Sequence, residues 1–539
     1  MSKAFYITTP IYYVNGDPHI GHAYTTIACD VLARFKRLDG FDVKFLTGTD
    51  EHGQKVAKTA ADKGIDPQKF CDAVSQQFRD LAQALGATND DFIRTTEPRH
   101  IASCQALWKR LEDNGQIYLS KYAGWYAVRD EAFYAVEETE TMELGISGKT
   151  VKPDGSIEEF YRKQRVAIPS GAPVEWVEEE SYFFPLSKYQ EKLLALYDAN
   201  PDFIGPKSRF NEVYSFVKGG LNDLSISRTT FSWGVPVPGN PKHVMYVWID
   251  ALTNYITALG FPDEAGEMKK YWPEVLHIVG KEIIRFHCVY WPAFLMAANL
   301  PLPKRVFAHG WWTHEGEKMS KSLGNVVDPL AMIEKYGLDQ LRFFLMREVP
   351  FGNDGDFSET ALVSRINAEL ANALGNLAQR FLSFIAKNLG GVLPEPGPFT
   401  DADKELLTSC HALLGQCREF FDRQAISDAL EAVWVVVRAA NGYVDVQAPW
   451  ALKKTDPARM NTVLYVLAEC VRHLAILIQP IVPTAARKML DQLAVPEGER
   501  TFAFLGPDHV LKGGATLPAP QGVFPRYGDP PKVAAGKGA

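Results

Sequence analysis

Residues 4–22 read AFYITTPIYYVNGDPHIGH, and the elements they imply set the architecture of the first part of the chain. The segment 4–14 is rich in aromatic and β-branched residues, which predicts a buried strand. Asp17 and Pro18 then offer a capping carboxylate and a first-turn proline, so a helix is expected next, ending near Gly40. A second strand is expected over 42–46, with Thr-Gly-Thr-Asp at its carboxyl end. Strand–helix–strand order predicts a parallel sheet, whose ligands bind at the carboxyl ends of its strands.

Further along the chain the pattern changes twice. From about residue 118 it becomes acidic and turn-rich, and the α/β pattern returns with strands expected at 275–279 and 306–308. Beyond residue 357, apolar residues recur at intervals of three and four, which predicts a helix bundle. The expected segments are a Rossmann-like α/β domain split in two (1–117 and 233–325), an inserted, mainly β or mixed subdomain (118–232), a linking region (326–357), an all-α domain (358–517) and a flexible tail (518–539).

Composition limits the class of protein. The 539 residues carry a formal net charge of -8, which predicts no general attraction to nucleic acid. The seven cysteines include no C-x-x-C pair, so neither a disulfide framework nor a cysteine-pair zinc site is supported. The N-terminus does not resemble a signal peptide, and the longest apolar run, near 433–437, is far shorter than the ~20 residues that span a bilayer. We therefore expect a cytoplasmic protein with no membrane partner.

The tetrapeptide His19-Ile20-Gly21-His22 falls where a strand passes into a helix N-terminus. Unpaired backbone N–H groups and the helix dipole favour an anion there, and two imidazoles add directed donors. Gly21 lets a flat ring approach the backbone. The motif indicates a triphosphate site, with a simple helix-start histidine pair or two metal ligands as the alternatives.

A second motif, Lys318-Met319-Ser320-Lys321-Ser322, lies in a polar loop expected at 311–325. Two lysines in a mobile, glycine-flanked loop can close over a polyphosphate and offset charge developing on a leaving pyrophosphate. A solvated lysine–serine loop is the alternative. Both motifs in this order, each after a predicted strand, make the nucleotide-binding interpretation much stronger than either alone.

The two motifs resemble the H-I-G-H and K-M-S-K-S signatures of class I aminoacyl-tRNA synthetases. Longer segments narrow the resemblance to the methionyl-tRNA synthetase family, from about residue 4 to 480. These segments are TTPIYYVNGDPHIGH, FLTGTDEHG, YVWIDALTNY, VGKEIIRFHCVYWP, HGWWTHEGEKMSKSLGN, NALGNLAQR and the tripeptide Ala448-Pro449-Trp450.

The resemblance implies a reaction and a set of site residues. Methionine and ATP would give methionyl-adenylate and pyrophosphate, and the methionyl group would pass to the 3′-terminal ribose of methionine-acceptor tRNA, the initiator included. Positioning and charge stabilisation should supply most of the rate, because a carboxylate needs no base. Mg²⁺ is expected to arrive with ATP rather than in a protein cage. The implied catalytic residues are His19, His22, Lys318 and Lys321, and the implied ATP contacts are His19, Gly21, His22, Glu282, Lys318, Ser320 and Lys321.

The methionine site can also be argued from chemistry. The substrate ammonium needs a carboxylate, and Asp50 stands at a strand end where a ligand would lie; capping the following helix is its alternative role. A polarizable thioether side chain favours aromatic and aliphatic contacts. The resemblance places Ile11, Tyr13, Trp248, Ala251, Tyr255, Ile283 and His287 around it. Without the resemblance, Trp248, Tyr255 and His287 would be read as core residues.

In the helical region, Asn372, Asn376 and Arg380 are spaced at i, i+4 and i+8, which predicts one polar stripe. Unpaired RNA bases are read by stacking and by amide and guanidinium hydrogen bonds. The resemblance places Asn376, Arg380 and Trp450 at the anticodon, and Asn372 lies on the same stripe. A solvated stripe beside a packed tryptophan is the alternative.

Zinc-bearing members of the family carry cysteine pairs in the inserted subdomain. Here the corresponding places hold Ala127 and Asp130 in one turn and Ala167 and Ser170 in the other. Alanine cannot ligate a metal, so we expect no structural zinc and no other resident metal. Packing among Trp125, Tyr126, Trp176 and Phe183 is expected to stabilise the subdomain instead. A monomer is expected, because no appended RNA-binding domain fits after about residue 480.

Other interpretations remain open at this stage. Another class I synthetase, for isoleucine, valine, leucine or cysteine, is one, although the insertion is short for an editing domain and lacks zinc-binding cysteines. A small nucleotidyltransferase shares the H-x-G-H helix start but lacks the helical domain. A non-catalytic tRNA-binding relative should not need both motifs.

Overall fold

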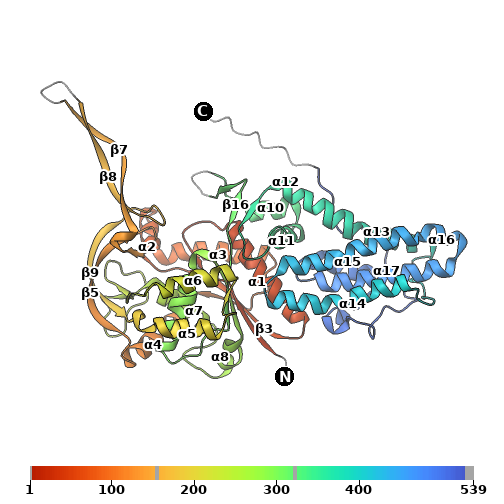
Figure 1. Ribbon diagram of the computed structural model, residues 1–539, viewed down its shortest axis with the longest axis horizontal. Coiled ribbons are helices and arrows are strands. Elements are labelled where there is room, and N and C mark those ends of the chain that lie inside the picture. Colours follow the sequence, from red (N-terminus) through yellow and green to blue (C-terminus); the bar gives the residue numbers. More distant parts are fainter. Residues whose placement is uncertain (1–2, 131, 152–156, 320–323, 529–539) are drawn as a thin grey trace.

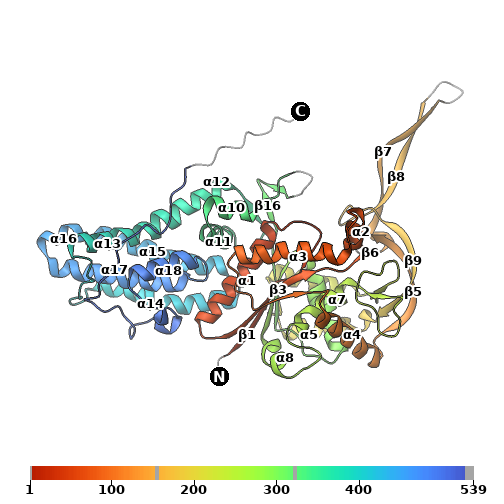
Figure 2. The same ribbon diagram turned by 180° about the vertical axis from the view of Figure 1, so that it is seen from behind.

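A computed structural model describes residues 3–130, 132–151, 157–319 and 324–528. The molecule is elongated, with an α/β part at one end and a helical bundle at the other (Figure 1). Helix α1 (Ile20–Leu38) lies at the junction between the two parts, as the view from behind also shows (Figure 2).

The α/β part is built on a parallel sheet. In spatial order its strands are β10 (Ile204–Gly205), β15 (Arg305–His309), β14 (Val275–Gly280), β1 (Ala4–Thr8), β3 (Asp42–Asp50) and β2 (Tyr12–Tyr13), with β4 (Asp91–Arg94) also paired to β3. The pairings among these strands are parallel. The predicted parallel α/β architecture is therefore confirmed.

The strand predicted over 4–14 is interrupted in the structure. β1 ends at Thr8 and β2 takes up only Tyr12–Tyr13, and both pair with β3. The break falls at Pro10, which has no N–H to contribute to the sheet.

The following helix also begins later than predicted. α1 starts at Ile20, and its N-cap is His19 rather than Asp17. The reason is that the His19 ring accepts a hydrogen bond from the Gly21 N–H, so a histidine provides the cap that a carboxylate was expected to provide. Helices α2 (Gln54–Asp62), α3 (Pro67–Ala84) and α4 (Pro98–Asp113) come next.

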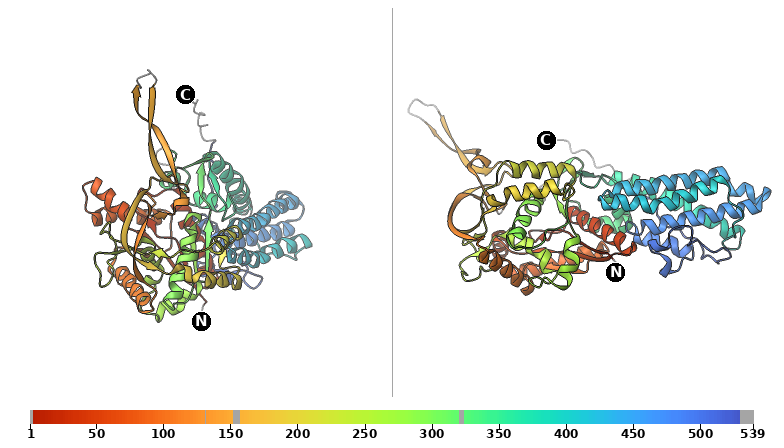
Figure 3. Two further views of the ribbon diagram at one scale, coloured as in Figure 1. Left: turned by 60° about the vertical axis from the view of Figure 1, so that its left-hand side comes forward. Right: turned by 60° about the horizontal axis from the view of Figure 1, so that its bottom comes forward.

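The inserted subdomain is mainly β. It contains β5 (Tyr118–Ala127), β6 (Ala132–Tyr134), β7 (Thr139–Val151), β8 (Ile157–Ala167) and β9 (Glu175–Phe184). β5 and β9 pair along most of their length, and β7 and β8 form an antiparallel hairpin that projects from the molecule (Figure 3).

The chain does not stay in the insertion throughout the expected 118–232, although β11 (Leu224–Ser225) still pairs with β9 of the insertion. After β9 the chain forms α5 (Gln190–Ala199) and α6 (Lys207–Lys218), and between them β10 joins the edge of the main sheet by pairing with β15. A two-residue strand is too short to show an alternating pattern, so the sequence could not reveal this early return.

The second half of the α/β part holds α7 (Val247–Thr257), α8 (Gly266–Tyr271) and α9 (Trp291–Ala297). The segment between β14 and α9 contains a 3₁₀ turn (Lys281–Ile283) and a π-helical turn (Phe286–Tyr290). The polar loop expected at 311–325 contains two short strands, β16 (Trp312–His314) and β17 (Glu317–Lys318). β16 also pairs with β18 (Gly355–Phe357), and α10 (Pro329–Tyr336) and α11 (Leu338–Arg347) lie between them in sequence.

The bundle confirms the helical pattern predicted beyond residue 357. Its elements are α12 (Glu359–Arg365), a π-helical segment (Ile366–Gly375), α13 (Asn376–Asn388), α14 (Asp401–Asp422), α15 (Ile426–Gln447), α16 (Pro449–Thr455), α17 (Pro457–Ile478) and α18 (Pro483–Gln492). α17 is long and apolar enough to cross a membrane by length and composition, but 94% of its apolar window is buried inside the molecule. It is the core helix of the bundle.

The end of the described chain is packed rather than free. Phe524 is 9% exposed, and Tyr527 exchanges two hydrogen bonds with Asn367 while its hydroxyl donates to the Tyr336 carbonyl at 2.8 Å. The part of the expected flexible tail that the structure describes, residues 518–528, therefore lies against the body. The isolated aromatic residues in a Pro- and Gly-rich segment were the signal for this contact.

Candidate active site

A cavity of about 890 Å³ opens at the carboxyl ends of the parallel strands. It is lined by thirteen of the residues predicted for the ATP and methionine sites, namely Ile11, Tyr13, His19, Gly21, His22, Asp50, Trp248, Ala251, Tyr255, Glu282, Ile283, His287 and Lys318. Ser320 and Lys321, also predicted there, lie outside the described residues. One cavity thus gathers side chains from five separated stretches of the chain.

The two histidines of the first motif hold each other at the start of α1. The His22 Nδ1 accepts from the His19 N–H, the His19 Nδ1 accepts from the Gly21 N–H, both at 3.1 Å, and the ring centres are 3.8 Å apart. With each Nδ1 acting as acceptor, the proton of each neutral ring lies on Nε2. A side chain at Gly21 would begin 3.0 Å from the His19 ring, so glycine gives this pairing its room.

Asp50 ends β3 at the edge of the cavity and is 7% exposed. Gly48 lies two residues earlier because a Cβ there would come within 2.0 Å of the Ile93 carbonyl oxygen of the neighbouring strand β4. α2 begins at Gln54 with Gly53 as its N-cap and no side-chain cap. Asp50 is therefore not the N-cap residue of that helix.

One wall of the cavity is aromatic and largely apolar. Trp248 stacks on Phe286 with ring centres 3.6 Å apart, and the Tyr255 hydroxyl lies 2.6 Å from the His287 Nε2. The His287 Nδ1 lies 3.0 Å from the Ile283 carbonyl oxygen, to which it can only donate, so Nε2 accepts from Tyr255. Burial lowers the pKa of His287 to about 4, so this ring is neutral near pH 7.

The opposite edge carries charge. The Trp311 Nε1 donates to Glu282 at 2.6 Å, and the Nζ atoms of Lys281 and Lys318 lie 4.2 and 5.0 Å from the centre of the Trp311 ring. Lys281 also pairs with Asp354. Neither Trp311 nor Lys281 was among the predicted site residues, although Trp311 lies in the segment HGWWTHEGEKMSKSLGN and Lys281 in VGKEIIRFHCVYWP. The only sequence signal for Lys281 was that it directly precedes Glu282, and the only signal for Trp311 was that it lies in the same segment as Lys318.

The predicted anticodon residues lie far from the cavity, on the bundle. The Arg380 guanidinium lies 5.3 Å from the centre of the Trp450 ring and donates to Asp445 at 2.9 Å. Asn372 and Asn376 are exposed on the same segment, and Trp450, on α16, is 47% exposed. The structure therefore brings Arg380 and Trp450 together. Asn372 lies in the π-helical segment rather than in regular helix.

The two turns of the insertion in which zinc ligands were considered, at residues 127–130 and 167–170, come together. Ser170 donates to the Asp130 carboxylate, which also accepts from the Tyr134 hydroxyl at 2.9 Å. Ala127 and Ala167 pack with Ala172 and Val174 in a small buried cluster. The rings of Trp125 and Trp176 meet edge to face at 5.4 Å, although Trp176 is 53% exposed.

A parallel sheet with paired histidines at a helix start and Lys318 on the facing edge is the arrangement expected of a class I aminoacyl-tRNA synthetase. The family model for tRNA synthetases class I (M) matches residues 5–382, and the model for the anticodon binding domain of methionyl tRNA ligase matches residues 393–532.

Individual relatives narrow the assignment. The methionine–tRNA ligase of Mesorhizobium japonicum is 60% identical to this chain, over 98% of this chain and 99% of the relative. The methionine–tRNA ligase of Brucella suis is 59% identical, over 97% of this chain and 98% of the relative. A structure of the Mycobacterium tuberculosis methionyl-tRNA synthetase in complex with methionyl-adenylate has a TM-score of 0.91 and 52% identity, over 97% of this chain and 100% of that one. The chain belongs to the methionyl-tRNA synthetase family.

Proposed function

We propose that this chain activates L-methionine with ATP and transfers the methionyl group to methionine-acceptor tRNA. The observation that carries the proposal is the single cavity that joins the His19–His22 helix start, the Asp50 carboxylate and the aromatic wall of α7. A triphosphate requires the helix start, an ammonium requires the carboxylate, and an apolar thioether requires the aromatic wall.

The phosphate side is assigned to the helix start and the facing lysines. The Nε2 donors of His19 and His22 and the N-terminus of α1 hold the triphosphate, and Lys318 adds positive charge from the other edge. Lys321 has the same role by its place in the motif. The methionine carboxylate attacks the α-phosphorus in line, a new C–O–P bond forms, and pyrophosphate leaves with its electron pair.

The methionine side is assigned to Asp50 and the apolar wall. Asp50 binds the ammonium, while Trp248, Tyr255 and His287 face the side chain. Ile11, Tyr13, Ala251 and Ile283 complete the lining. Neutral His287 suits a thioether, because an imidazolium would have to be desolvated in this pocket. Glu282, with Gly21 and Ser320, completes the ATP site.

The bundle is assigned to tRNA. The exposed Trp450 ring and the adjacent Arg380 guanidinium provide a stacking face and a hydrogen-bonding fork, which is how unpaired bases are bound. Asn372 and Asn376 extend that face. Charge does not attract RNA to the molecule as a whole, so recognition rests on these local contacts.

Metal use and assembly complete the proposal. Mg²⁺ enters with the ATP phosphates. Among the described residues, the one group of three His, Cys, Asp or Glu side chains close enough to share an ion is His100, Cys104 and Asp250, which do not line the cavity.

The inserted subdomain folds without zinc, because Ala127, Asp130, Ala167 and Ser170 cannot form a zinc site. The enzyme acts as a cytoplasmic monomer.

The test is ATP–pyrophosphate exchange screened against each standard amino acid. The proposal predicts exchange that depends on methionine, followed by charging of methionine-acceptor tRNA. Exchange led by isoleucine, valine, leucine or cysteine would assign the chain to another class I synthetase activity. Exchange in the absence of any amino acid would favour a nucleotidyltransferase.

A further inference from the structure

A fully buried carboxylate, Asp250, lies in the first turn of α7 between two histidines from distant parts of the chain. The Asp250 Oδ2 lies 2.7 Å from the His52 Nδ1, and Oδ1 lies 2.8 Å from the His100 Nε2. Burial alone would raise the pKa of Asp250, but the two histidines reverse that effect and hold the pKa below its ordinary value. An ionised carboxylate only accepts hydrogen bonds, so both histidines donate to it.

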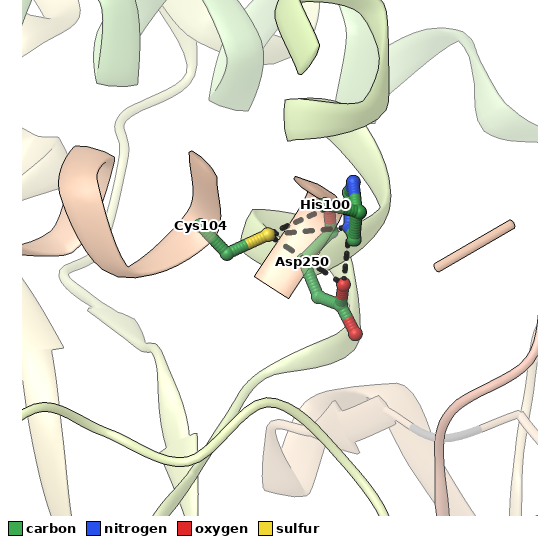
Figure 4. A group of neighbouring side chains, drawn as sticks. All are labelled: His100, Cys104 and Asp250. Carbon is green, nitrogen blue, oxygen red and sulfur yellow. Dashed lines mark hydrogen bonds and ion pairs between the residues drawn. The ribbon is translucent and has the colours of Figure 1, made fainter. Parts of the chain in front are cut away.

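The third member of this group, Cys104, does not make it a metal site. Figure 4 shows His100 and Cys104 on α4 facing Asp250 on α7. The 2.8 Å between Nε2 and Oδ1 is a hydrogen-bond distance, whereas two ligands around one tetrahedral zinc ion would lie about 3.3 Å apart. Burial raises the pKa of the Cys104 thiol well above its usual value, so the sulfur keeps its proton. The group is a hydrogen-bonded cluster.

Asp250 connects the two sides of the methionine cavity. His52 follows Asp50 by two residues, directly after β3, and Asp250 directly precedes Ala251 on the helix that carries Trp248 and Tyr255. The hydrogen bond from His52 to Asp250 therefore joins the loop that carries the ammonium-binding carboxylate to the helix that carries the aromatic wall.

Other bonds hold the same loop to different partners. Glu51, between Asp50 and His52, accepts two hydrogen bonds from Arg94 at 2.7 and 2.9 Å, and its carbonyl accepts from the Trp233 Nε1 at 2.6 Å. These bonds fix the loop against β4 and Trp233. The bond to α7 comes from His52.

The second histidine, His100, contacts α7 at two positions. His100 lies on α4 and is fully buried, and its Nδ1 lies 3.3 Å from the Thr257 hydroxyl at the other end of α7. α4 therefore contacts α7 through polar bonds near both of its ends, which limits tilting of the helix relative to the strand ends.

We infer that Asp250 and His52 are positioning residues that fix the distance between the Asp50 carboxylate and the aromatic wall of α7, and so measure the length of the amino-acid side chain. The inference rests on the proposed function. A fixed separation suits a substrate whose ammonium and thioether are held apart by a chain of set length. A loosened separation admits a longer homologue such as ethionine, which carries one more methylene beyond the sulfur.

The test compares three variants in ATP–pyrophosphate exchange with methionine and with ethionine. His52→Ala removes the donor, and His52→Asn keeps an N–H donor near the position of Nδ1. Cys104→Ala is the matched control, because the Cys104 thiol also contacts Asp250, at 3.7 Å from its carbonyl oxygen and 3.8 Å from Oδ1, but its removal leaves the His52–Asp250 bond in place. Substituting His52, which is 5% exposed, is preferred to removing the fully buried Asp250 carboxylate, which would leave both histidines without their acceptor.

The expected result is a rise of about tenfold or more in the KM for methionine with His52→Ala, with the KM for ATP unchanged. The preference for methionine over ethionine should fall, and His52→Asn should restore much of it. Cys104→Ala should lower thermal stability while leaving both KM values and the preference unchanged.

Two outcomes would overturn the inference. One is an equal loss of the preference for methionine over ethionine in His52→Ala and Cys104→Ala, which would mean that both variants act through general destabilisation. The other is a preference for methionine that does not change in a folded His52→Ala variant. If His52→Ala does not fold, the His52→Asn variant decides. The inference then fails if the preference of His52→Asn for methionine over ethionine is no closer to the wild-type preference than that of Asp50→Asn. Wild-type protein without methionine-dependent exchange would instead refute the proposed function.

Discussion

His287, at the floor of the cavity, has both ring nitrogens in hydrogen bonds that require a neutral ring. Nδ1 donates to the Ile283 carbonyl and Nε2 accepts from the Tyr255 hydroxyl. Protonation of Nε2 would remove the acceptor and place a charge in an apolar site. Burial accordingly lowers the pKa of His287 from its ordinary 6.5 to about 4.

This shift predicts a pH dependence of stability. Between about pH 6.5 and 4 the unfolded chain binds a proton at this position and the folded chain does not, so the free energy of unfolding falls as the pH falls through that window. Relative to His287→Asn, wild type should lose about 3 kcal/mol of stability on going from pH 7 to 4. Urea unfolding of both proteins across the range measures it, and parallel stability curves would contradict it.

Trp450 offers a residue-scale test of tRNA recognition. Removing a stacking ring from an exposed base-binding face should cost about 1–3 kcal/mol, or roughly five- to 150-fold in kcat/KM for tRNA. Trp450→Ala should therefore impair aminoacylation and leave methionine-dependent exchange unchanged. Val446→Ala, at an 80% exposed position on the neighbouring helix α15, is the control and should alter neither. Equal loss of exchange and charging in Trp450→Ala would show that the two sites are not separate.

At the scale of elements, local patterns predicted the strands of the parallel sheet and the helices of the bundle, because continuous apolar runs and a 3.6-residue period are strong signals. Local patterns did not predict features that depend on contacts between residues far apart in the sequence. β10 is too short to show a pattern, the π-helical turns leave no mark in the spacing of apolar residues, and Tyr527 is held by partners 160 and 191 residues away.

The candidate site followed the same rule. His19, His22, Asp50 and Lys318 could be found because each stands at a strand end or helix start with chemistry suited to a ligand. His52 and Asp250 could not, since their roles depend on a bond between residues 198 apart in sequence.

The paired turns of the insertion give an element-scale prediction. A serine–aspartate hydrogen bond and packed alanines occupy the two turns in which the family resemblance led us to look for zinc ligands. Metal analysis of purified, chelator-washed protein should find well below one zinc ion per chain. A tightly held zinc at one per chain would contradict the account.

At the scale of the molecule, α1 connects the active site to the bundle. Its first turn carries the histidine pair, and its far end packs on α14, where Phe35 stacks on Phe421 with ring centres 3.9 Å apart. The Arg418 Nε lies 3.0 and 3.1 Å from the two carboxylate oxygens of Asp39, and a buried pair, Arg342 and Asp30, lies deeper in the same junction at 2.7 Å.

The stacked pair is expected to stabilise this junction. Phe421→Ala should lower the free energy of unfolding by about 3–5 kcal/mol, because it leaves a cavity against α1. Phe420→Ala, a partly buried neighbour on the same helix, should cost clearly less. Urea unfolding of both variants tests this, and an equal cost would mean that the stack does not fasten the two parts.

We propose that one cavity binds methionine for activation and that Asp50 binds its ammonium. The most direct measurement is the KM for methionine of Asp50→Asn in ATP–pyrophosphate exchange, with the KM for ATP as internal reference. Loss of a buried charge-assisted hydrogen bond predicts a rise of about ten- to hundredfold in the KM for methionine and little change in that for ATP. An unchanged KM for methionine would contradict the account.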